Sequence, residues 1–217
     1  MNEQLEALIK CFNTIKHDEL SLEMKQYASV HDVPIIQDEG LELMLQLLRI
    51  KQPRRILEIG SAIGYSSLMM ARHLPHVEIV SIERDANRYR EAVNYHERSN
   101  VKQRVTLIEA DALEIQNKAL HHETFDVIFI DAAKAQYQKF FEKYEPLLAE
   151  GGMIISDNLL FHGFVLKQQS EIESRNLRQL VRKIDHYNHW LAENEAYDTL
   201  LLPIGDGVAV SLKRTLK

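Results

Sequence analysis

Two apolar runs in this chain each end abruptly in polar side chains that could bind a metal ion. One run ends at Asp131, and the other ends at Asp157 and Asn158. Lys134 stands three residues beyond Asp131. Carboxylate and amide oxygens are hard ligands, which suit Mg²⁺ and also Ca²⁺ or Mn²⁺ rather than zinc. The pattern predicts a metal site with a candidate base, Lys134, beside it.

These side chains meet only if the two runs, 125–130 and 153–156, are neighbouring parallel strands. A Glu-Gly-Gly sequence at 150–152 closes the segment between them. Within that segment aromatic and leucine side chains recur at helical spacing: Tyr137, Phe140, Phe141, Tyr144, Leu147 and Leu148. A strand, a crossover helix and a strand build a parallel sheet, whose carboxyl edge binds ligands in open α/β folds. The alternative is that Asp131 and Asp157 cap the following helices and that Lys134 is an ordinary solvated lysine.

A second candidate site follows the earlier apolar run 55–59. Gly60 and Gly64 let the backbone approach a ligand without a Cβ clash. Glu83 ends the next predicted strand, about 20 residues on, where a carboxylate can bind both ribose hydroxyls. The spacing differs from the dinucleotide pattern G-x-G-x-x-G, so a nucleoside without pyrophosphate fits better. For Gly60 and Gly64 the alternative is a tight turn that binds no ligand. Asp111, after the third predicted strand, could either face an adenine amino group or cap a helix.

The elements that must position these residues alternate between strand and helix. Strands are predicted at 55–59, 78–82, 105–108, 125–130 and 153–156, followed by a long polar helix over 171–192 and an antiparallel pair at 199–204 and 208–212. We therefore predict an α/β fold with a doubly wound sheet and helices on both faces. A single domain spans 1–217. Its residues 1–52 form helices, the first through Leu5, Leu8, Phe12 and Ile15, that serve as a lid or a dimer surface, and 53–217 form the α/β core.

Composition excludes several classes of protein. The net charge of −6 argues against a protein that coats nucleic acid without specificity, although a local basic patch could still bind it. No apolar run is long enough to span a bilayer, so we expect no membrane partner. Cys11 is the only cysteine, which excludes a disulfide within the chain and favours a reducing cytoplasm.

The combination of motifs resembles the metal-dependent, catechol-type O-methyltransferases over nearly the whole chain. The matching motifs are 56–60 with 64–66, then 130–134, then 157–158, with 38–40 (DEG) in the preceding helix. The resemblance implies a Rossmann-like class I methyltransferase fold with a seven-stranded, mostly parallel sheet and a C-terminal antiparallel hairpin. It also implies a homodimer.

The same resemblance assigns roles to individual residues. It implies that Asp131, Asp157 and Asn158 bind Mg²⁺ and that Lys134 is the general base. It further implies an S-adenosyl-L-methionine (SAM) site formed by Val33, Ile35, Glu58, Gly60, Ser61, Tyr65, Ser66, Glu83, Asp111, Ala112 and Asp131.

The expected acceptor depends on two positions and on the tail. Small-catechol enzymes of the family carry a bulky aromatic side chain between the aspartate and the lysine, whereas this chain has Ala132 and Ala133. The tail, 183–191 and 203–207, most resembles bacterial tRNA 5-hydroxyuridine methyltransferases. We therefore expect methyl transfer to 5-hydroxyuridine at the tRNA wobble position. A small catechol or hydroxycinnamoyl-type acceptor is the alternative, because both acceptors present two vicinal oxygens. A third hypothesis is that the protein is a noncatalytic nucleotide-binding or RNA-binding module.

Basic side chains near the end of the chain are candidate contacts for a tRNA anticodon loop. They are Lys167, Arg175, Arg178, Arg182 and Lys183, and the three arginines recur at helical spacing. Phosphate contacts of this kind would position the RNA. The alternative is an ordinary solvated helix face, because Glu171 precedes Arg175 by four residues and could pair with it.

Overall fold

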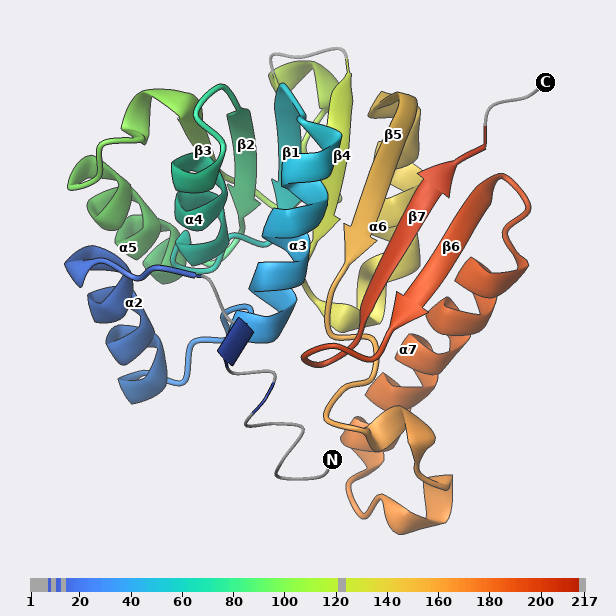
Figure 1. The fold of residues 1–217 in the computed structure, drawn as a ribbon. Coiled ribbons are helices and arrows are strands. Elements are labelled where there is room, and N and C mark those ends of the chain that lie inside the picture. Colours follow the sequence, from blue (N-terminus) through green and yellow to red (C-terminus); the bar gives the residue numbers. More distant parts are fainter. Residues whose placement is uncertain (1–7, 9–10, 13–14, 121–123, 215–217) are drawn as a thin grey trace.

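Seven strands form one mixed sheet in the order β3-β2-β1-β4-β5-β7-β6 (Figure 1). The computed structural model describes residues 8, 11, 12, 15–120 and 124–214. The strands are β1 (Arg55–Ile59), β2 (Glu78–Glu83), β3 (Val105–Glu109), β4 (Phe125–Ile130), β5 (Leu148–Ser156), β6 (Tyr197–Leu202) and β7 (Val208–Lys213). The first five pair in parallel, whereas β7 is antiparallel to β5 and to β6. The predicted sheet and its C-terminal hairpin are confirmed.

Helices cover both faces of this sheet (Figure 1). They are α2 (Glu19–Val30), α3 (Asp38–Lys51), α4 (Tyr65–His73), α5 (Ala86–Glu97), α6 (Tyr137–Tyr144) and α7 (Arg175–Glu193). Short 3-10 turns are η1 (Lys102–Arg104), η2 (Asn117–Leu120), η3 (Lys134–Gln136), η4 (Glu145–Leu147), η5 (Phe164–Leu166) and η6 (Gln169–Glu171). None of the helices in the described ranges combines the length and apolarity that a membrane crossing needs.

Two hydrophobic clusters hold the layers together. Ile56 of β1 packs in a cluster with side chains of α2, α3 and α4, such as Leu45. Its neighbour Leu57 packs in the cluster on the other face, with Phe141 of α6 and Tyr187 of α7. Successive side chains of a strand point to opposite faces, and both faces here are buried. The run 55–59 is therefore apolar at nearly every position.

The opening helices pack on the α/β core. Met24 of α2 and Leu41 of α3 are fully buried in the first cluster. Lys25 Nζ donates to Asp38 Oδ1 over 2.7 Å, which ties the two helices together. The first predicted helix, through Leu5, Leu8, Phe12 and Ile15, lies largely outside the described residues.

Two predicted helix boundaries were wrong. The helix after β4 was expected to continue to Leu148, but α6 ends at Tyr144 because Pro146, which lacks an N–H, stands in the next turn. β5 then begins at Leu148. The polar helix was expected to begin at Glu171, but α7 begins at Arg175, where the Ser174 side chain accepts from Leu177 N over 3.3 Å.

Candidate active site

The register of the sheet brings the ends of four strands to one edge. Ile59 of β1 pairs with Ile82 of β2 and with Ile130 of β4, and Ile130 pairs with Ser156 of β5. The residues that follow these positions therefore lie in a row along the carboxyl edge. They are Gly60, Glu83, Asp131 and Asp157. The strand order reverses between β1 and β4, which is the point where open α/β sheets bind ligands.

Gly60 allows the loop after β1 to lie directly against the end of β4. Its φ is +93°, in the region that favours glycine. A Cβ at this position would lie 2.2 Å from the carbonyl oxygen of Asp131. The Gly60 N–H donates to Ile82 O over 2.9 Å, so the loop is held by β2 on its other side. No residue with a side chain fits here without moving backbone.

Glu83 is fixed at the edge of the cavity by two backbone donors. Its side chain accepts from Ala62 N at Oε2 and from Asp85 N at Oε1, each over 2.8 Å. Only 7% of the residue is exposed. Each carboxylate oxygen has two lone pairs, so the group can still accept from the hydroxyls of a ligand.

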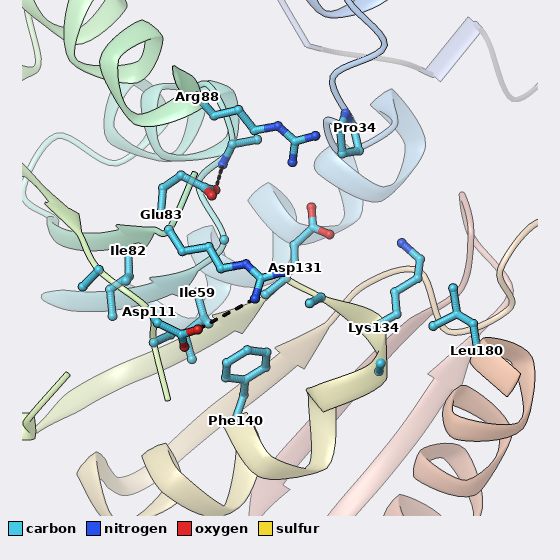
Figure 2. A pocket seen from close by; sticks show the side chains of 18 residues that line it. Pro34, Ile59, Ile82, Glu83, Arg88, Asp111, Asp131, Lys134, Phe140 and Leu180 are labelled. Atoms are coloured by element: carbon cyan, nitrogen blue, oxygen red, sulfur yellow. Dashed lines mark hydrogen bonds and ion pairs between the residues drawn. The ribbon is translucent and has the colours of Figure 1, made fainter. Parts of the chain in front are cut away.

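A cavity of about 420 Å³ opens along this edge (Figure 2). Six predicted site residues line it: Gly60, Glu83, Asp111, Ala112, Asp131 and Lys134. Figure 2 shows the Asp131 and Lys134 side chains pointing the same way from the end of β4. The cavity therefore joins the predicted nucleoside site to one predicted metal ligand, Asp131, whereas Asp157 and Asn158 do not line it.

The other predicted cofactor residues do not line this cavity. Val33 and Ile35 flank Pro34, which does line it. Ser61 Oγ and Tyr65 OH are buried, and neither has a hydrogen-bond partner among the described residues. Buried polar atoms are normally paired. These two hydroxyls, one in the loop and one at the start of α4, are left without a partner by the described part of the fold.

Glu58 supports the loop from within the sheet and does not reach the cavity. It is fully buried and accepts from the hydroxyls of Ser66 on α4 and Ser81 on β2. Burial raises the pKa of Glu58 to about 7. The hydrogen bonds from Ser66 and Ser81 favour the ionised form and lower the pKa, but burial has the larger effect. Ser66 is thereby held by Glu58, although the resemblance had placed both residues in contact with the cofactor.

Asp111 caps a turn and pairs with an arginine, while its predicted role toward adenine stays a prediction. Its Oδ1 accepts from Leu113 N over 2.8 Å, so it caps a turn that does not continue as a helix. Its Oδ2 lies 3.7 Å from an Arg84 guanidinium nitrogen, and a dashed line in Figure 2 marks this pair at Asp111. Arg84 and Arg88 both line the cavity and were not predicted. Arg84 directly follows the strand-end Glu83, but this position does not by itself show where its side chain lies.

Asn158 joins the two predicted metal-binding carboxylates. Its Nδ2 donates to Asp131 Oδ1 over 2.9 Å and lies 3.4 Å from Asp157 Oδ2. Asp157 Oδ1 accepts from the backbone N–H of Asn158 over 2.8 Å. The η3 turn after Asp131 has no side-chain cap. The helix-capping alternative is thus not what these acids do in the structure.

Asp131, Asp157 and Asn158, here called the acid–amide set, offer oxygen atoms of the kind that a divalent cation binds. Burial raises the pKa of Asp131 and of Asp157, and the Asp131 charge raises the pKa of Asp157 further. A bound cation would neutralise this repulsion. Rotating the Asn158 amide by half a turn would bring its oxygen to the side where Nδ2 now lies. Within the described ranges no three His, Cys, Asp or Glu side chains gather to hold a metal, so the amide would have to serve as the third ligand.

Lys134 stands at the mouth of the cavity beside an aromatic ring. Its Nζ lies 5.6 Å from the ring centroid of Phe161, within the range of a cation–π contact. The Lys134 charge acts on Asp131 by lowering its pKa. Leu180 of α7 lines the cavity on the same side. Lys134 therefore reaches both the cavity and the acid–amide set.

Two of the five predicted RNA-binding side chains are used within the fold. Arg178 donates to the backbone carbonyls of Ile172 and Glu173. Arg182 Nε donates to Gln169 Oε1 over 3.0 Å. These bonds hold the segment 168–174 against α7. The remaining three, Lys167, Arg175 and Lys183, are exposed, as is Arg182, and Lys167 Nζ lies 4.6 Å from the ring centroid of Phe164.

Glu171, which was predicted to pair with Arg175 along a helix, belongs to the separate turn η6. Its carboxylate accepts from Gln168 N over 2.8 Å, in a capping box. The four-residue helical spacing between Glu171 and Arg175 therefore does not exist. The reason is that the chain is extended at Ile172 before α7 begins.

Comparisons with known proteins agree with this geometry. The family model described as O-methyltransferase matches residues 14–214. A caffeoyl-CoA O-methyltransferase of Populus kitakamiensis is 30% identical over 190 residues, which cover 86% of this chain and 80% of that protein.

Two solved structures extend the likeness to the fold. A Staphylococcus aureus protein provisionally named caffeoyl-CoA O-methyltransferase superposes with a TM-score of 0.90 and 38% identity, covering 98% of this chain and 100% of that one. The Podospora anserina methyltransferase PaMTH1, solved with SAH bound, gives a TM-score of 0.82 and 25% identity over 99% of this chain and 97% of that one. With the glycine loop and the acidic strand end in place, the chain belongs to the SAM-dependent O-methyltransferase family.

Proposed function

We propose that this protein transfers the methyl group of SAM to one of two vicinal oxygens of an acceptor, assisted by a divalent cation. One observation supports this most directly. Asn158 holds Asp131 and Asp157 together at the sheet edge where Gly60 and Glu83 line the cavity. A cation and a methyl donor bound there would lie side by side, and such placement of reactants supplies much of the rate of a group transfer.

Asp131, Asp157 and Asn158 would hold the cation, which we propose to be Mg²⁺, with Ca²⁺ or Mn²⁺ as possible substitutes. When bound, SAM supplies an electrophilic methyl group, and the cation supplies a Lewis acid that favours the ionised acceptor oxygen. Lys134, in its neutral amine form, would receive the proton of the acceptor hydroxyl at Nζ and become an ammonium, since this side chain lines the cavity.

The cofactor would lie along the loop after β1. Glu83 would accept from the ribose hydroxyls, and Asp111 stands where it could accept from the adenine amino group. For this the Arg84 guanidinium would have to release Asp111, from which it lies 3.7 Å away. The unpartnered hydroxyls of Ser61 and Tyr65 would bind the methionine end.

A small catechol-type or hydroxycinnamoyl-type phenol is the first candidate acceptor. The name of the Populus relative supports this class, because a caffeoyl group carries two vicinal hydroxyls. The cavity next to Lys134 is lined by Ala132, Ala133, Phe140 and Leu180, which leave an apolar path for a ring.

The wobble 5-hydroxyuridine of tRNA is the second candidate, and a different observation favours it. The two positions between Asp131 and Lys134 are alanines and not bulky aromatics, and Lys167, Arg175 and Lys183 are exposed on the neighbouring segments. α7, which carries Arg175 and Lys183, packs against both η3, which carries Lys134, and η5, which Lys167 follows. An anticodon loop could place its phosphates on them while one unstacked base enters the cavity.

Labelled SAM distinguishes the two acceptors. The protein is incubated with bulk tRNA lacking the wobble methylation and, separately, with a panel of catechols, each with and without a chelator. Asp157→Asn should abolish transfer to any acceptor, and the chelator should do the same. Arg175→Glu should reduce transfer to tRNA only, because it alters a surface charge outside the cavity. Transfer that withstands the chelator would refute the role of the metal, and transfer to catechols alone would refute the tRNA assignment.

A further inference from the structure

The loop after β5 carries a run of backbone conformations that L side chains rarely adopt. Asn158 has a φ of +64°, Phe161 of +46°, His162 of +53° and Gly163 of +75°. Three of the four are not glycine, and one of them is a proposed metal ligand. Such residues persist only where surrounding contacts determine the backbone. Something in the fold must therefore hold this loop.

The turn between β6 and β7 supplies those contacts. Leu159 N donates to Gly207 O over 2.9 Å, and Leu160 N donates to Asp206 O over 2.8 Å. His162 N donates to the Asp206 carboxylate at Oδ1. Three N–H groups of the loop thus end on two residues of the hairpin turn.

Asp206 is buried in this contact, with 5% of the residue exposed. Its Oδ2 has no hydrogen-bond partner among the described residues and lies 3.6 Å from Nδ1 of His162, whose side chain is 62% exposed. An acid of this kind is rarely buried unless it is paired. The one hydrogen bond that its carboxylate does make goes to the loop.

The turn and the loop also meet by direct packing. A Cβ on Gly207, whose φ is +89°, would lie 2.8 Å from Leu160 N. Backbone rests on backbone here, so side-chain rotation cannot absorb a shift. The C-terminal hairpin, far from the loop in the sequence, thus helps to fix it, together with Asn188 of α7, whose Nδ2 donates to Leu159 O over 3.0 Å.

Both ends of the loop reach the proposed site. Asn158 at its start bonds to Asp131, and Phe161 further along places its ring 5.6 Å from Lys134 Nζ. We propose, resting on the proposed function, that Asp206 is a positioning residue that holds Asn158 and Phe161 in place for metal binding and acceptor placement. It acts mainly through the loop and does not line the cavity, and its charge also raises the pKa of Asp157.

Amide hydrogen exchange over residues 157–164 tests this without requiring activity. In Asp206→Ala the amides of Leu159, Leu160 and His162 should lose protection, because the bond to His162 is gone and the turn is loosened. Asp206→Asn keeps an oxygen at the same place and should restore protection. His162→Ala removes only the exposed ring and should leave protection unchanged. Asp198→Ala is a matched control, since it removes an exposed carboxylate that accepts from Arg214 at the far end of the same hairpin.

Ligand binding provides a second measurement. Mn²⁺ affinity, followed by electron paramagnetic resonance, should fall by about ten-fold to a hundred-fold in Asp206→Ala, as for other supports of metal ligands, while the Kd for SAM stays within about two-fold. The kcat for the acceptor should fall with the KM for SAM unchanged, and Asp206→Asn should recover most of both losses. Unchanged exchange and unchanged Mn²⁺ affinity in a folded Asp206→Ala would overturn the proposal. If Asp206→Ala does not fold, failure of Asp206→Asn to protect the loop amides overturns it instead.

The outcome is separable from the proposed function. If the wild-type protein methylates none of the acceptors, the proposed function fails, but loss of loop protection in Asp206→Ala still establishes that the hairpin holds the loop. If the wild type is active and exchange does not change, the proposed function stands and the role of Asp206 is refuted.

Discussion

Glu58 should make the protein less stable as the pH rises, and Glu58→Gln should remove that dependence. The carboxyl is fully buried under the glycine loop, and its pKa is raised from 4.5 to about 7. The folded state therefore holds the proton more tightly than the unfolded chain does. Between about pH 4.5 and about pH 7 the folded state is protonated while the unfolded state is not, so stability falls as the pH rises through this window.

The size of the effect follows from the shift. At about 1.4 kcal/mol per pKa unit, a rise from 4.5 to about 7 corresponds to about 3 kcal/mol of unfolding free energy lost across the window. Glutamine cannot ionise, and the hydroxyls of Ser66 and Ser81 can turn to suit its amide. Any constant cost of the amide shifts the stability of the variant equally at every pH. The difference between variant and wild type therefore isolates the ionisation.

Urea unfolding followed by circular dichroism, from about pH 4.5 to about pH 8, measures this difference. The unfolding free energy of Glu58→Gln relative to wild type should increase by about 3 kcal/mol across the range. In Ser81→Ala, with Glu58 intact, the unfolding free energy should go on falling to higher pH than in the wild type, because one donor that favours the Glu58 carboxylate is missing. A difference between Glu58→Gln and wild type that is the same at every pH would show that the hydroxyl donors keep Glu58 ionised, and the reasoning would be refuted.

Three further predictions concern the site. Gly60→Ala should abolish SAM binding in calorimetry and lower the unfolding free energy by about 1–3 kcal/mol, because its Cβ meets the Asp131 carbonyl; wild-type SAM affinity would contradict this. Lys134→Met keeps an apolar chain of similar length and should lower kcat by about 10²–10⁴-fold with the Kd for SAM unchanged; full activity would exclude Lys134 as the base. Mg²⁺ should raise the Tm of the wild type and not that of Asp157→Asn, since a cation that binds only the folded state stabilises it; equal shifts would place the ion elsewhere.

Much of the fold could be predicted from the sequence because the period of apolar residues changes where the structure changes. The run 125–130 is apolar nearly throughout since both faces of β4 are buried, and the Gly-Asp-Gly turn at 205–207 marks the hairpin. Boundaries were less certain. Leu147 and Leu148 continue the helical spacing of α6, but Pro146 ends the helix, so the local backbone chemistry outweighed the pattern.

The site was predictable where strand ends supply it and not where loops do. Asp131 and Asp157 follow adjacent strands, so topology alone brings them together. Arg84 was missed because a charged residue after a strand usually faces solvent, and only the path of the chain shows that this one lines the cavity. Arg178 was assigned to RNA because helical spacing identifies a face, yet it cannot show that backbone carbonyls of Ile172 and Glu173 occupy that face.

The proposed cofactor site and the proposed metal site are in contact through the backbone. Gly60 lies where any Cβ would strike the carbonyl oxygen of Asp131, so the loop that would hold the methyl donor rests on the residue that would hold the cation. Pairing of Ile59 with Ile130 sets this contact, and the sheet cannot slip without moving every buried side chain to the wrong face. The spacing between the backbones of the two proposed sites is thereby determined by strand register. Methyl transfer depends on the alignment of the two reactants, and a sheet edge provides that alignment before either one binds.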